Sequence, residues 1–62
     1  MMEKFKVTLM FGDGSSIVAN IECDMKVAVL EMARGWLITS KIGVWVTVQD
    51  LSGNPIITYF NN

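Results

Sequence analysis

The sequence predicts an α+β fold in which two β-hairpins flank one α-helix (ββαββ), giving one four-stranded sheet with the helix packed on one face. Two segments with alternating polar and apolar residues, each interrupted by a glycine-containing turn, indicate the hairpins. The stretch between them repeats its apolar residues at helical spacing. We expect a single domain spanning residues 1–62, because so short a chain supports one core.

The first hairpin is predicted over residues 3–11 and 17–23, where the odd-numbered positions are mostly apolar in both segments. We expect a three-residue loop at residues 12–14, with its last glycine at positive φ. This loop sets Leu9 opposite Ile17 on the core face. A two-residue loop would shift the register by one and place polar side chains in the core.

Residues 25–39 are predicted to form the helix, with Asp24 as the N-cap because its carboxylate also favours the positive end of the helix dipole. Val27 and Ile38 lie on the side away from the expected core stripe. That stripe consists of Met25, Val29, Met32, Ala33, Trp36 and Leu37.

The second hairpin is predicted over residues 44–50 and 55–60, joined by a type I turn with Gly53 at positive φ. The expected inward pairs are Val48 with Ile56, Val46 with Thr58 and Val44 with Phe60. The expected outward pairs are Trp45 with Tyr59 and Thr47 with Ile57. The first strand should be internal, and the strand orders 2-1-4-3 and 2-1-3-4 are both compatible with the pattern.

Residues for catalysis are scarce in this chain. It has no histidine, which excludes a Ser-His-Asp triad and a His-activated cysteine. Cys23 is the single cysteine, so an intrachain disulfide is excluded, and we expect it to act as a small buried apolar residue. The carboxylates are scattered through turns and strand ends. We therefore expect no catalytic, cofactor-binding or metal-binding residues, and a protein that is not an enzyme.

The N-terminal segment alternates polar and apolar residues, which is not the pattern of a signal peptide. The longest apolar stretch, residues 27–38, is too short and too charged to span a membrane. Together with the free thiol, this predicts a cytoplasmic protein without membrane contact.

Apolar residues make up 52% of the chain, more than one small core needs. The surplus is expected on the sheet face away from the helix and on the outer side of the helix. Aromatic residues and methionine are enriched in the centres of protein interfaces. The predicted interface residues are Met10, Val18, Trp45, Ile57, Tyr59, Val27 and Ile38.

This surplus predicts a non-enzymatic protein-interaction module that forms homo-oligomers. Small inhibitors or adaptors of phages and mobile elements have this size and lack of catalytic residues. The alternative is single-stranded nucleic-acid binding on the open sheet face, with Trp45 and Tyr59 stacking on bases and Lys4 and Lys6 meeting phosphates. A net charge of −1 disfavours nucleic acid.

Overall fold

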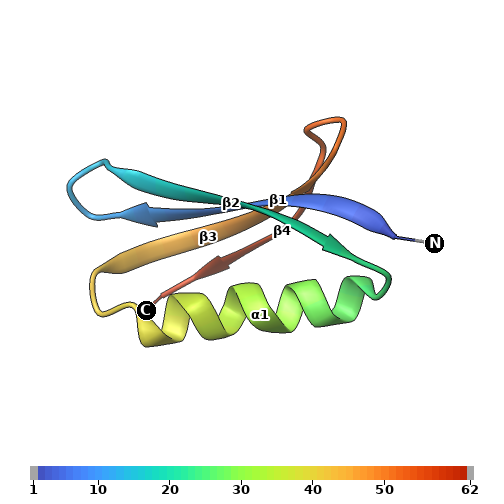
Figure 1. Ribbon diagram of the computed structural model, residues 1–62. Helices are drawn as coiled ribbons and strands as arrows, with labels where there is room; N and C mark the ends of the chain where they lie inside the picture. Colours follow the sequence, from blue (N-terminus) through green and yellow to red (C-terminus); the bar gives the residue numbers. More distant parts are fainter. Residues whose placement is uncertain (1, 62) are drawn as a thin grey trace.

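The computed structural model describes residues 2–61 and has the predicted ββαββ architecture (Figure 1). Its elements are β1 (Glu3–Phe11), β2 (Ser16–Cys23), α1 (Lys26–Thr39), β3 (Gly43–Asp50) and β4 (Pro55–Phe60). The strands form one antiparallel sheet in the order β2-β1-β3-β4. The helix lies along one face of this sheet, and no other segment of residues 2–61 covers the opposite face.

The strand order is 2-1-3-4, one of the two orders compatible with the sequence. It puts β3 inside the sheet, where Val46 and Val48 are 0% exposed. It also puts β4 at an edge, beginning with Pro55. Proline lacks a backbone N–H, so an edge position suits it better than a central strand.

The first hairpin has the predicted register and turn. Leu9 pairs with Ile17, and Lys4 pairs with Glu22 on the other face. The N–H of Gly14 donates to the carbonyl of Phe11 at 3.1 Å, and Gly14 has φ +90°. The predicted three-residue loop and its left-handed glycine are therefore confirmed.

The second hairpin has the predicted turn but not the predicted register. Gly53 has φ +84°, and the Asp50 N–H donates to the Asn54 carbonyl at 3.1 Å. Beyond this turn a β-bulge shifts the pairing between Val48 and Gln49, and Ile56 is the extra residue. The pairs that follow are Val48 with Ile57, Thr47 with Thr58, Val46 with Tyr59 and Trp45 with Phe60.

The predicted pairing of Val46 with Thr58 is wrong because it would have turned a hydroxyl toward the core. The bulge reverses the orientation of β4 beyond Ile56. Thr58 instead lies opposite Thr47, and their Oγ1 atoms are 3.0 Å apart in a hydrogen bond. The inward positions on β4 go to apolar groups, which increases the apolar area removed from water.

The core lies between the helix and the sheet. Its buried residues are Phe5, Val7, Leu9, Val29, Ala33, Leu37, Val46 and Val48. On the helix these are Val29, Ala33 and Leu37, four residues apart in succession, so the buried stripe is narrower than predicted. Trp36 is half-buried against the core, whereas Met25 and Met32 are exposed.

The helix begins one residue later than expected, so the prediction of Asp24 as N-cap is wrong. Met25 is the N-cap residue, with extended backbone and no side-chain capping hydrogen bond. The carboxylate of Asp24 precedes the cap and does not reach the first N–H groups of the helix. Cys23 lies half-buried against the core, and its Sγ is 3.4 Å from the Met25 carbonyl oxygen.

Candidate protein-interaction face

The sheet face opposite α1, called the open face below, carries the side chains that alternate away from the core. At one end it presents a row of neighbouring side chains, one from each strand. Met10 lies between Ser16 and Trp45, and Trp45 lies between Met10 and Phe60. Three large apolar side chains are therefore adjacent across β1, β3 and β4, on the face that the helix leaves uncovered.

The partial burial of residues in this row is not due to the core. Phe60 is 67% exposed, and Val18, two pairs further along the first hairpin and on the same face, is 48% exposed. Trp45 and Met10 are half-buried, although neither belongs to the residues packed against the core. Their neighbours on the open face must therefore cover part of them. Apolar side chains that adjoin on an uncovered face differ from the scattered exposed residues of an ordinary surface.

The open face changes character along the strands. The row next to Met10 and Trp45 is Val18, Thr8, Thr47 and Thr58. The following row is Asn20, Lys6 and Gln49, and Glu22 pairs with Lys4 beyond it. The face is thus apolar at one end, hydroxyl-lined in the middle and charged at the other end. Polar groups therefore border the apolar row on one side, as they do at the rim of a protein interface.

The structure separates the predicted interface residues into distinct groups. Met10, Val18 and Trp45 lie on the open face, as predicted. Ile57 and Tyr59 do not: they pair with Val48 and Val46 and pack against the core. Their predicted place on the open face is wrong because the bulge at the start of β4 shifts every later residue to the other side of the sheet.

Phe60 is the open-face residue that sequence reasoning missed, since it was expected to point inward beside Val44. Two signals in the sequence could have revealed it. Ile56 and Ile57 are consecutive apolar residues, which breaks the alternation of a regular strand. The expected register also placed the hydroxyl of Thr58 in the core, the same fault that excluded the two-residue loop in the first hairpin.

Val27 and Ile38 are exposed on α1, at 63% and 67%. Helical geometry puts both on the side away from Val29, Ala33 and Leu37, which pack on the sheet. They are therefore separated from Trp45 by the whole thickness of the domain and do not extend the open face.

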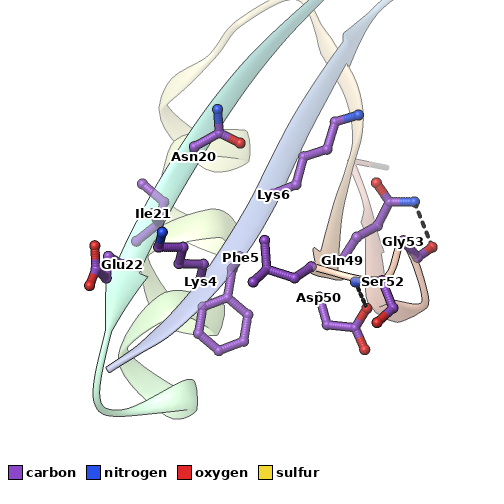
Figure 2. A pocket seen from close by; sticks show the side chains of 11 residues that line it. Lys4, Phe5, Lys6, Asn20, Ile21, Glu22, Gln49, Asp50, Ser52 and Gly53 are labelled. Carbon is purple, nitrogen blue, oxygen red and sulfur yellow. Dashed lines mark hydrogen bonds between the residues drawn. The ribbon is translucent and has the colours of Figure 1, made fainter. Parts of the chain in front are cut away.

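A shallow hollow of about 630 Å³ lies near the charged end of the sheet. Figure 2 shows Lys4 and Lys6 on β1 and the β3–β4 turn beside them. The polar groups of that turn are engaged locally. The Gln49 Nε2 donates to the Gly53 carbonyl at 3.2 Å, and Asp50 Oδ1 accepts from the Ser52 N–H at 2.9 Å. These bonds hold the turn and do not aim a reactive group into the hollow.

The groups named for nucleic-acid binding are not brought together. Tyr59 lies on the core side, so it does not stand beside Trp45. Lys6 pairs with Gln49, four residues along β3 from Trp45, which is about 13 Å at strand spacing. Lys4 lies further still, opposite Glu22. The aromatic and basic parts of the open face are thus at different ends of it.

Comparison with known proteins gives no match to a protein-family model, to a curated protein or to a solved structure. Within residues 2–61, no helix has the length and apolar character needed to cross a bilayer. The same residues contain no group of three or more His, Cys, Asp or Glu side chains arranged to hold a metal ion.

Proposed function

We propose that the protein is a non-enzymatic protein-interaction module that binds through the apolar end of its open face and self-associates. The observation that carries this proposal is the adjacency of Met10, Trp45 and Phe60 across three strands on the uncovered face. Covering this surface removes apolar area from water, at about 25 cal/mol per Å². The hydroxyl row and the charged end then form the rim of the contact.

A protein surface fits this face better than a nucleic acid does. Single-strand binding combines stacking aromatic side chains with a cationic groove along the backbone. Here the two lysines of the open face are interspersed with Glu22 and lie away from the aromatic row. With a net charge of −1, the chain lacks the basic surface that attracts phosphates.

The mechanism is occlusion: the apolar row packs against a complementary surface and excludes water and competing ligands from it. An inhibitor or adaptor of a larger cellular assembly needs no more chemistry than this. The absence of histidine and the single cysteine in the sequence agree with such a role.

Sedimentation equilibrium of the wild type and Trp45→Ala tests the proposal. We expect the wild type to associate in the micromolar range and Trp45→Ala to weaken this association at least tenfold, about 1.4 kcal/mol or more. The Trp45 side chain lies on the face away from the core and is not among those packed against it, so the variant should keep the circular dichroism spectrum of the wild type.

Ile38→Ala is the matched control, because it also removes an exposed apolar side chain but from the outer side of α1. It should leave the association constant unchanged. Equal association of wild type and Trp45→Ala would contradict the open face as a binding surface. Equal weakening by Ile38→Ala would show general stickiness instead of a defined face.

A further inference from the structure

Strand β2 forms an edge of the sheet with a complete set of unpaired backbone groups. The Phe11 N–H donates to the Ser15 carbonyl at 2.9 Å, so Ser15 and the odd-numbered residues of β2 bond to β1. In an antiparallel sheet the N–H and C=O groups of successive residues point to opposite sides. Those of Ser16, Val18, Asn20 and Glu22 therefore point away from β1, beyond the edge.

This edge lacks the features with which proteins protect sheet edges from pairing, namely proline, lysine, bulges and short strands. β2 is eight residues long, its pairing with β1 is regular throughout, and its single charged residue is Glu22. The opposite edge, β4, is protected: it has six residues, begins with Pro55 and carries the bulge at Ile56.

Apolar side chains are also left uncovered along β2, on both sides of the sheet. Ile17 faces the helix layer yet is 48% exposed, because α1 packs most closely on β3. Val18 on the open face is exposed to the same extent. An added strand beside β2 would cover both side chains and pair the free backbone groups together.

We propose that β2 pairs antiparallel with β2 of a second copy of this chain around a two-fold axis at Ala19, joining two sheets into one. This inference deepens the self-association proposed above and names a contact distinct from the open face. A two-fold axis makes the contact isologous, so one unprotected edge supplies both halves of it. Strand addition of this kind is a recurrent mode of protein association.

The position of the axis follows from the backbone. The outward backbone N–H and C=O groups belong to the even-numbered residues of β2, and they must pair with the same groups of the second copy. Even-numbered residues pair with even-numbered residues only if the two-fold axis passes through a residue and not between two. With the axis at Ala19, Ser16 lies opposite Glu22 of the second copy and Val18 lies opposite its Asn20. Every β2 residue whose backbone groups point outward is then paired. An axis at Val18 or Asn20 leaves one of them opposite a residue outside β2.

Side chains agree with the same register. On the core side, Ile17 meets Ile21 of the second copy and Ala19 meets its own counterpart. Small and branched apolar side chains are then in contact, and no like charges are opposed, since the two Glu22 carboxylates lie at opposite ends of the pairing. Both helices fall on one side of the joined sheet and both open faces on the other, so the apolar rows stay accessible.

Disulfide trapping tests the register directly. In a Cys23→Ser background, Ala19→Cys should form a covalent dimer on mild oxidation, because a pair on the axis without mutual hydrogen bonds has Cα atoms about 4.5 Å apart. Val18→Cys and Asn20→Cys are the controls. Their counterparts are offset by two residues, about 7 Å along the strand in addition to the spacing between strands, which is beyond disulfide reach.

Proline substitution tests the edge by sedimentation in the Trp45→Ala background, where the contribution of the open face is weakened. Asn20→Pro should reduce the remaining dimer at least tenfold, because it deletes an outward N–H of β2. Thr58→Pro deletes an outward N–H of β4 and should leave the dimer unchanged. Circular dichroism of each variant verifies the fold.

The proposal is supported if Ala19→Cys forms more disulfide-linked dimer than Val18→Cys and Asn20→Cys do. It is also supported if Asn20→Pro loses the dimer and Thr58→Pro keeps it. Trapping that is equal at the three positions, or strongest at 18 or 20, overturns it, and so does a dimer that Asn20→Pro leaves intact. If Trp45→Ala weakens association while these edge variants do not, the edge contact fails and the open face stands. If the edge variants weaken association while Trp45→Ala does not, the open face fails as a binding surface and the edge contact stands.

Discussion

Trp45 lies directly opposite Phe60 across β3 and β4, on the side of the sheet that the helix does not cover. The next residue along the chain from Trp45, Val46, faces the core and meets Tyr59. Two aromatic residues adjacent in sequence, Tyr59 and Phe60, therefore belong to different layers of the protein. This separation has a direct consequence for stability.

Tyr59→Ala and Phe60→Ala should differ in their effect on folding. Tyr59 is half-buried against the core, so its truncation should cost roughly 2–3 kcal/mol, below the ~3–5 kcal/mol of a fully buried aromatic. Phe60 is largely exposed, and its removal should cost less than about 1 kcal/mol, the worth of a cross-strand pair. Urea denaturation at low protein concentration measures both. If Phe60→Ala instead lost more stability than Tyr59→Ala, the result would favour the register without the bulge, in which Phe60 faces the core.

The turn glycines should resist replacement by valine. Gly14 and Gly53 have φ of +90° and +84°, where a β-branched residue is strained by roughly 1–3 kcal/mol. Each valine variant should therefore lower the denaturation midpoint. Asparagine tolerates this backbone region, so Gly14→Asn and Gly53→Asn should lower the denaturation midpoint clearly less than the valine variants do. Equal losses for valine and asparagine would point to a cause other than backbone conformation.

Two other glycines should respond to alanine in opposite directions. A Cβ at Gly43 would lie 3.1 Å from Leu9 Cδ1 and 3.2 Å from Leu37 Cδ1, so Gly43→Ala crowds the core and should cost about 1–3 kcal/mol. A Cβ at Gly35 would meet nothing within 4 Å. Gly35→Ala should stabilise the helix by up to ~1 kcal/mol. Thermal melting of both variants decides the matter, and stabilisation by Gly43→Ala would contradict the described packing.

Asp13 should make the first turn sensitive to acid. The Ser15 hydroxyl and backbone N–H both donate to its Oδ1, and this lowers the pKa of Asp13 below 3.8. Because the folded-state pKa is the lower one, the stabilisation is present above about pH 3.8 and is lost as the pH falls through the lowered value. The effect should be small, since the carboxylate is fully exposed.

Wild type should accordingly exceed Asp13→Ala in denaturation midpoint at neutral pH, and the difference should shrink as the pH falls below 3.8. Ser15→Ala removes the hydroxyl, the larger cause of the shift, and keeps the backbone bond. It should show an intermediate pH dependence. A difference that is constant throughout acid titration would rule out the ionised carboxylate as its source.

The first hairpin was predictable from sequence because its information is local. Alternating residues from Phe5 to Leu9 determine one face, and the glycine at position 14 permits the turn that pairs Leu9 with Ile17. The helix was predictable in outline for the same reason, from the spacing of Val29, Ala33 and Leu37. Its first residue was not, because the chain leaves β2 through Cys23 and Met25 without a capping side chain.

The sequence by itself determined the element types, both left-handed turn glycines and the placing of Met10, Val18 and Trp45 on one face. Tertiary structure decided the strand order and the orientation of β4, and for β4 the local sequence offers only the break in alternation at Ile56 and Ile57. The strand order depends on β1 pairing with β3, residues far apart in the chain whose contact no local pattern encodes. The orientation depends on a single bulged residue, Ile56, which the protein accepts because the core gains Ile57 and Tyr59, and Phe60 moves beside Trp45.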